Sequence, residues 1–90
     1  MIHSYRIDVY GVVQGVGFRW FTQRTANKHH IVGWVCNNSN GSVDMRVQGQ
    51  ESNVKAFIKA INQGPGYFSR VDRVLKQPVA PFESNNFAIK

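Results

Sequence analysis

The chain has 90 residues, and eleven Lys and Arg against five Asp and Glu give it a formal net charge of +6. This length fits one domain over residues 1–90, and no apolar run reaches the ~18 residues of a membrane span. The one cysteine excludes an intrachain disulfide and, with no secretory signal at the start, indicates a cytoplasmic location.

The charged residues and the histidines limit the function further. The basic residues are scattered, so the charge suits a small anionic substrate or a nucleic acid without choosing between them. His29 and His30 are adjacent with no carboxylate close by in sequence, and Cys-rich patterns are absent. We therefore predict no metal site.

The first predicted element is a strand over residues 5–11, where apolar and polar side chains alternate. A glycine-rich segment follows it, GVVQGVGFR from Gly11 to Arg19. From about Phe18 to His29 the hydrophobic period becomes helical. The residues expected on its buried stripe are Phe18, Phe21, Thr25, Ala26 and His29.

The middle of the chain predicts a hairpin of two strands. Residues 31–38, IVGWVCNN, are rich in the β-branched and aromatic types that favour strands. Residues 42–48 alternate again, and the side chains expected to point inward are Val43, Met45 and Val47. The turn between the two strands, Ser39-Asn40-Gly41, contains the Asn-Gly pair typical of hairpins.

The second half of the chain predicts a helix and two strands. The helix runs from about residue 52 or 53 to 62, with apolar residues at i, i+3, i+4 and i+7, namely Val54, Phe57, Ile58 and Ile61. Gly64-Pro65-Gly66 ends it. A strand is predicted over 70–77, but which of its side chains face the core stays open, because Val74 and Leu75 are neighbours. A short strand covers 87–89.

The order of these elements is β-α-β-β-α-β with an additional C-terminal strand, the ferredoxin-like arrangement of the α+β class. We expect an antiparallel sheet covered on one face by the two helices. With the strands at 5–11 and 42–48 in the centre, the glycine-rich loop opens at one end of the sheet. The fold hosts many functions and names none of them.

The glycine-rich loop has the composition of an anion-binding site. Gly11, Gly15 and Gly17 leave backbone amides unshielded and permit positive φ angles. Amides at a helix N-terminus bind anions with the helix dipole behind them. Arg19 in the first turn adds a planar fork of donors that fits phosphate. The spacing matches neither familiar nucleotide loop, so we predict a phosphoryl-binding loop of another kind.

Asn37, near the end of the second predicted strand, is the candidate for holding a water molecule. Its amide both accepts from and donates to water, although a run of Asn and Ser residues is also typical of a plain loop. No Ser-His-Asp, Cys-His or paired-carboxylate arrangement is legible. A site without a base or metal suits hydrolysis of a mixed anhydride, because its carboxylate leaves without protonation and phosphoryl transfer relies on positioning and charge.

Three motifs together resemble the acylphosphatase family: GVVQGVGFR at 11–19, GWVCN at 33–37 and GSVDMRVQG at 41–49. The resemblance runs from Tyr5 to Ile89, and the first two motifs are highly specific at this spacing. It implies a small cytosolic enzyme of ferredoxin-like fold that hydrolyses carboxyl-phosphate bonds without a cofactor. Expected substrates are acyl phosphates such as acetyl phosphate, carbamoyl phosphate or 1,3-bisphosphoglycerate.

By that resemblance, Arg19 binds the phosphoryl group and Asn37 orients the nucleophilic water. The phosphate cradle it implies consists of the backbone amides of Gln14, Gly15, Val16, Gly17, Phe18 and Arg19. Inorganic phosphate or sulfate is the expected competing anion, and we expect a monomer without a membrane or nucleic-acid partner. Three positions depart from the family's usual pattern: Cys36, where many relatives carry Arg or Lys, and Tyr67-Phe68, where smaller residues are more familiar.

Two functions other than the enzyme also occur on this fold. Acylphosphatase-like domains also occur in large hydrogenase-maturation proteins that handle carbamoyl phosphate, so the alternative is a catalytically silent domain that binds phosphate or carbamoyl phosphate. An RNA-binding module of the same fold carries its aromatic residues on the third strand. The third strand here, SVDMRVQ, has none, and we therefore expect no RNA binding.

Overall fold

Five strands and two helices form the computed structural model, which describes residues 1–66 and 68–90. Tyr67, one of the departures noted above, lies outside them. The elements are β1 (Ile2–Val12), α1 (Phe18–Lys28), β2 (Val32–Asn37), β3 (Val43–Gln50), α2 (Glu51–Gln63), β4 (Arg70–Pro78) and β5 (Phe87–Ile89). Every predicted element is present, with ends that differ by a few residues, and the ferredoxin-like order is confirmed.

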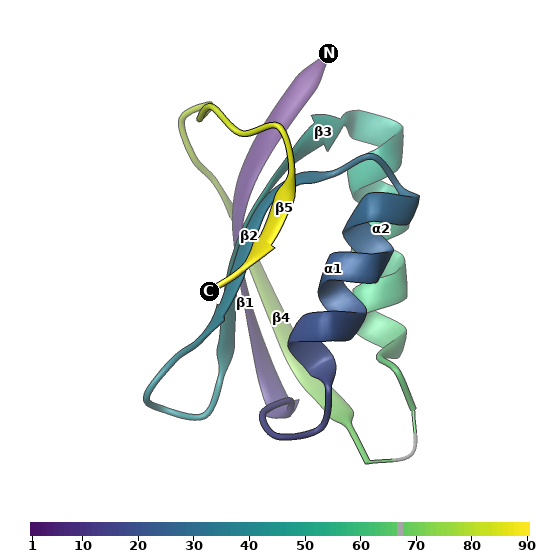
Figure 1. Cartoon of the computed structure of the whole chain (residues 1–90), viewed down its shortest axis with the longest axis vertical. Coiled ribbons are helices and arrows are strands. Elements are labelled where there is room, and N and C mark those ends of the chain that lie inside the picture. The colour runs from purple at the N-terminus through teal and green to yellow at the C-terminus, as the bar shows by residue number, and fades with distance from the viewer. Residues whose placement is uncertain (67) are drawn as a thin grey trace.

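The strands lie in the order β4-β1-β3-β2-β5, so the first and third strands are interior as predicted. The expectation of an antiparallel sheet is wrong at one edge, because β5 pairs in parallel with β2. The other three pairings are antiparallel. After β4 the chain crosses the end of the sheet and returns beside β2 in the direction of β2 (Figure 1), which makes the sheet mixed.

Both helices cover one face of the sheet, and the core lies between the two layers (Figure 1). The predicted inward positions are confirmed, since Val43, Met45 and Val47 are fully buried. On α1 the predicted stripe is wrong in one place. His29 lies beyond the last helical residue and is only partly buried, whereas Thr22 is fully buried and satisfies its hydroxyl by donating to the Phe18 carbonyl at 2.9 Å.

The open phase of β4 is decided by a bulge. Tyr10 pairs with Arg73 but Gly11 pairs with Val71, so one residue of β4 has no opposite partner. The extra residue brings both Val71 and Val74 to the core side, and Leu75 lies on the other side. Gly11 is required there, because a Cβ at its φ of 139° would lie 2.0 Å from a β4 carbonyl oxygen.

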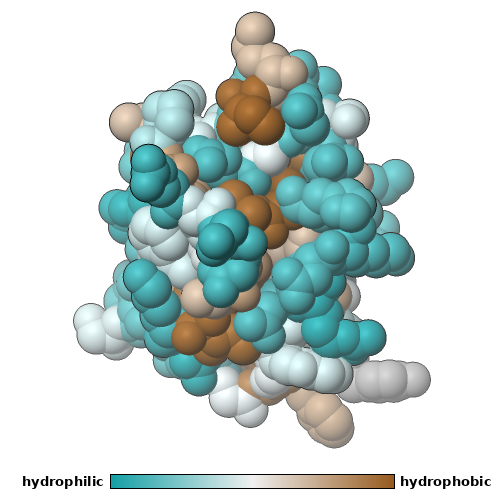
Figure 2. All heavy atoms as spheres, turned by 45° about the horizontal axis from the view of Figure 1, so that its top comes forward, coloured by the Kyte–Doolittle hydropathy of each residue, from teal (hydrophilic) through white to brown (hydrophobic). Residues whose placement is uncertain are grey.

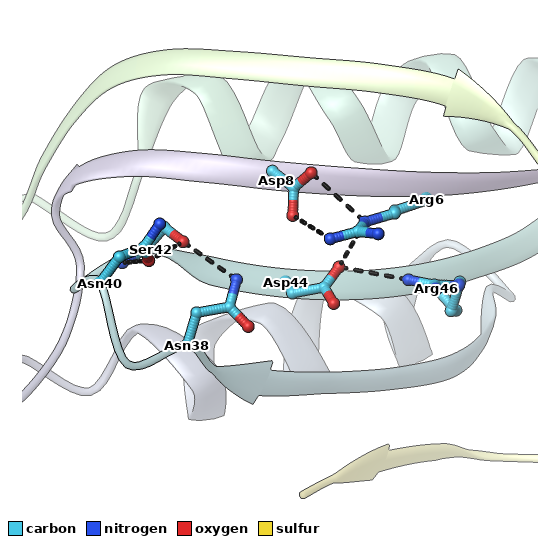
Figure 3. A network of polar contacts seen from close by, with 7 residues as sticks. All are labelled: Arg6, Asp8, Asn38, Asn40, Ser42, Asp44 and Arg46. Carbon is cyan, nitrogen blue, oxygen red and sulfur yellow. Dashed lines mark hydrogen bonds and ion pairs between the residues drawn. The ribbon is translucent and has the colours of Figure 1, made fainter.

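The face of the sheet without helices carries a charge-balanced ion network (Figure 3). The Arg6 Nε lies 3.3 Å from an Asp8 oxygen and 3.4 Å from an Asp44 oxygen. The same Asp44 oxygen lies 3.2 Å from Arg46 Nη1. Burial is the largest cause that raises the pKa of Asp44, Asp8 adds to it, and the two arginines oppose it. Two cations and two anions are paired within this network.

The ion network predicts a pH dependence of stability. A carboxyl whose pKa rises on folding destabilises the folded state at neutral pH and does so less as the pH falls through that raised pKa. We expect the free energy of unfolding of the wild type, minus that of Asp44→Asn, to be larger near about pH 3 than near pH 7. Urea denaturation at both pH values measures it, and a difference that grows with pH would contradict the assignment.

The surface drawn in Figure 2 is mostly hydrophilic, and its hydrophobic residues lie in small separate patches. Single exposed apolar residues of this kind are normal for a folded domain. Large hydrophobic side chains that are more than a third exposed among the described residues are Met1, Ile2, Val12, Trp20, Phe68, Leu75 and Ile89. The expectation of a monomer stays a prediction.

Candidate active site

The glycine-rich loop after β1 and the β2–β3 hairpin lie at the same end of the sheet (Figure 1). A cavity of about 200 Å³ opens beside the glycine-rich loop. It is lined from four parts of the chain, the loop after β1, the start of α1, the end of β2 and β5, by Val13, Gly15, Gly17, Phe18, Arg19, Trp20, Asn37 and Ile89. Segments far apart in sequence therefore meet at one small cavity.

The N-terminus of α1 presents unused amides to this cavity. Gly15 and Gly17 have φ angles of 74° and 78°, and Gly17 is the left-handed N-cap residue without a side-chain capping bond. The first backbone bond at this end runs from the Phe21 N–H to the Gly17 carbonyl at 3.0 Å. The amides of the preceding turn thus have no acceptor within the helix, and no acidic side chain occupies that turn. This is the backbone arrangement that binds anions.

Arg19 is the second residue of α1, and the residue that follows β5 accepts a hydrogen bond from its guanidinium. Nη1 donates to the main-chain oxygen of Lys90 at 3.1 Å, and the Lys90 N–H donates to the Val35 carbonyl of β2 at 2.8 Å. Of the described residues that line the cavity, Arg19 alone carries a charge. Its field is therefore unopposed by any lining carboxylate, which favours an anion as the occupant.

Asn37 is the last residue of β2, and the strand register decides which way it points. It lies opposite Val43, whose side chain is buried under the helices. Cys36 lies opposite Asp44 on the face of the sheet without helices, the open face. The predicted opposite orientation of Cys36 and Asn37 is thereby confirmed. The register brings the exposed Asn37 amide to the cavity that Arg19 lines, and it leaves the thiol on the open face of the sheet.

The side chain of Gln14 fastens the loop to the hairpin. Its Nε2 donates to the carbonyl of Asn38 at 2.7 Å and to that of Ser42 at 2.8 Å. Within the hairpin, Asn38 Nδ2 donates to Ser42 Oγ at 3.0 Å, and Asn40 Oδ1 accepts from the Ser42 hydroxyl at 2.6 Å (Figure 3). Asn37 directly precedes this bonded turn, so Gln14 fixes the spacing between the candidate water site and the anion loop.

The structure brings together most of the residues that the sequence singled out. Those that line the cavity are Gly15, Gly17, Phe18, Arg19 and Asn37. Gln14 and Val16 are not among its described lining residues, and Gln14 acts through its side chain instead. Sequence reasoning missed Val13, Trp20 and Ile89. Trp20 adjoins Arg19 in the chain, and this position could have predicted its place at the cavity. No local pattern predicted Ile89.

No group of three or more His, Cys, Asp and Glu comes together to hold a metal ion within residues 1–66 and 68–90. In the same ranges, no helix has the length and apolar character needed to cross a bilayer.

Comparison with known proteins identifies a family. A family model described as acylphosphatase matches residues 5–89. An acylphosphatase of Leuconostoc mesenteroides is 52% identical over 84 residues, 93% of each chain. The crystal structure of acylphosphatase from Bacillus subtilis aligns with a TM-score of 0.91 at 38% identity, over 100% of this chain and 99% of that chain. Full-length HypF in a phosphate- and nucleotide-bound form aligns at 0.93 and 37% identity, over 100% of this chain but 12% of its own.

Proposed function

This chain belongs to the acylphosphatase family, and on that premise we propose how it hydrolyses the carboxyl-phosphate bond of acyl phosphates. Arg19 and the backbone amides of residues 14–19 hold the phosphoryl group, and Asn37 orients the attacking water. The observation that carries the proposal is the meeting of Arg19, Asn37 and the free amides of the α1 N-terminus at one small cavity.

The chemistry follows from what lines the cavity. The phosphoryl oxygens accept hydrogen bonds from the amides and the guanidinium, which stabilise the charge as the transition state forms. The water oxygen forms a bond to phosphorus while the phosphorus–oxygen bond to the carboxylate breaks, and the carboxylate leaves as an anion. No Asp, Glu or His is among the described lining residues, so the water proton passes to a phosphoryl oxygen of the substrate.

The test is hydrolysis of acetyl phosphate and of benzoyl phosphate by the purified chain in EDTA. We expect turnover that does not depend on added metal, since the proposed groups supply the positioning and the charge. Release of inorganic phosphate measures both reactions, with a heat-denatured sample as the background. Absence of turnover, with phosphate still bound, would contradict the enzyme and favour the alternative.

That alternative is a catalytically silent domain that binds phosphate or carbamoyl phosphate. One specific observation favours it, because full-length HypF carries a region alike in fold within a much longer chain that was solved with phosphate and nucleotide. Against it, Arg19 and Asn37 are both present here and line the same cavity. A silent anion site has no need of an amide beside the cradle to orient water.

Replacing Gln14 by leucine is expected to impair the site without touching its ligand groups. The variant loses both hydrogen bonds to the hairpin, which lowers stability by about 1–2 kcal/mol. It also frees the hairpin that carries Asn37, so we expect kcat to fall about tenfold or more, since small misplacements near the chemistry are costly. Urea denaturation and acetyl phosphate hydrolysis measure the two effects.

The matched control is Gln63→Leu, the same change at an exposed position on the last residue of α2. We expect it to leave kcat within about twofold, as surface substitutions away from special features have small effects. A folded Gln14→Leu variant with the kcat of this control would contradict the positioning role of Gln14.

A further inference from the structure

We propose that Trp20 and Ile89 form an apolar wall that receives the acyl part of the substrate, and that the enzyme therefore favours small acyl phosphates with an uncharged, apolar and planar acyl group. This inference rests on the proposed function, because it assigns the part of the cavity that the phosphoryl group does not occupy. The juxtaposition behind it is a polar cradle beside two partly exposed hydrophobic side chains.

The wall is exposed where a core residue would be buried. Trp20 is 58% and Ile89 39% exposed, although both line the cavity beside Arg19. Large apolar side chains next to a few convergent polar groups are typical of small-molecule sites. An exposed indole offers a flat, rigid surface on which a planar group stacks. The two side chains thus have the chemistry to bind an acyl group and no described role in the core.

A side-chain contact positions Trp20, and strand pairing positions the backbone of Ile89. The guanidinium carbon of Arg24, one turn along α1, lies 4.5 Å from the centroid of the Trp20 ring and covers one side of it. Ile89 is the last residue of β5 and is opposite Val35 in the parallel ladder with β2. The Lys90 N–H extends that ladder to Val35. The wall is therefore pre-positioned by a helix and a paired strand, which lowers the entropic cost of binding.

The charge of the lining residues and the size of the cavity limit which acyl groups can bind. Arg19 is the one charged group among the described lining residues, and the phosphoryl group engages it. A second anionic group on the substrate would lie against Trp20 and Ile89, where no lining residue is left to pair with it; Arg24 lies over the indole but is not among the described lining residues. The cavity of about 200 Å³ is smaller than the roughly 300–1,000 Å³ of sites for drug-sized ligands. It has room for a phosphoryl group with a short chain or a single ring.

The experiment compares kcat/KM for benzoyl, acetyl and succinyl phosphate in the wild type, Trp20→Ala and Trp20→Phe. We expect Trp20→Ala to lower the benzoyl-to-acetyl ratio of kcat/KM about fivefold, since it removes the stacking surface. Trp20→Phe, which keeps a ring, should restore most of that ratio. The matched control is Leu75→Ala, an apolar side chain 40% exposed on the open face of the sheet, which should leave the ratio unchanged.

Each other outcome has a distinct meaning. A benzoyl-to-acetyl ratio that is equal in Trp20→Ala and Leu75→Ala overturns the wall and leaves the proposed hydrolysis intact. A wild-type preference for succinyl phosphate that Arg24→Ala removes also overturns it, since the acyl site is then cationic. If the wild type hydrolyses none of the three substrates, the proposed function fails and this inference fails with it.

Discussion

Arg19→Ala is expected to lower the turnover of acetyl phosphate by about 10³-fold or more and to weaken the binding of inorganic phosphate. The guanidinium is the one charged group among the described residues that line the cavity. In the proposed mechanism it binds the phosphoryl oxygens directly. Loss of a single neutral oxyanion donor already costs about 10²–10³ in kcat, and a charged fork is the stronger donor. Steady-state kinetics and the inhibition constant of phosphate measure the two losses.

Two further variants make the result specific. Arg73→Ala removes an arginine from the open face of the sheet and should leave turnover unchanged. Its guanidinium carbon lies 5.5 Å from the centroid of the Tyr10 ring. Arg19→Lys keeps the charge but loses the planar fork, so it should fall between the wild type and alanine. Near-normal turnover by a folded Arg19→Ala variant would remove Arg19 from the mechanism.

Asn37→Ala is expected to separate catalysis from binding. We expect kcat to fall about 10²-fold or more, because the water loses the group that orients it in the transition state. The inhibition constant of inorganic phosphate should change by less than about threefold, since the cradle of amides and Arg19 is untouched. The Asn37 side chain is exposed at the end of β2, so the fold should tolerate its truncation.

The control is Asn85→Ala, an exposed asparagine in the segment that returns from β4 to β5. It should change neither kcat nor phosphate inhibition. If Asn37→Ala instead lowers phosphate affinity and kcat by the same factor, Asn37 holds the ligand and does not act on the water. The pattern across the Arg19 and Asn37 variants thus distinguishes an anion clamp from a water-orienting amide.

Local sequence patterns predicted the helices and strands of this fold and the positive φ angles of its glycine-rich loop. Alternation at Val43, Met45 and Val47, and the helical spacing of Val54, Phe57 and Ile61, report which side of each element is apolar, and those sides form the core. Glycines at 15 and 17 announce positive φ before a helix, and both adopt it. Side-chain chemistry and periodicity act over a few residues, so these features can be predicted from short stretches of the sequence.

Other features depended on which strands meet. The apolar residues of β4 did not show which of Val74 and Leu75 faces the core, because a bulge opposite Gly11 sets the phase. The parallel pairing of β5 with β2 depends on the path of the returning segment, and it alone brings Ile89 to the cavity. The glutamine at 14 was assigned for its amide, yet its side chain spans to a hairpin 24 residues away.

Residue types within a few positions of one another were therefore enough to predict the secondary structure, the helix-covered sheet and the family motifs. Only the packed fold shows that Arg19, Asn37 and Ile89 share one cavity with Trp20. Strand order and register bring together residues that are far apart in the sequence, and they arise from backbone pairing across the sheet. An exposed side chain on a strand is compatible with many such pairings and therefore does not predict them. The residues proposed to bind the phosphoryl group could be predicted from the sequence. Of the surface proposed to meet the acyl group, only Trp20 had a local signal, its position beside Arg19.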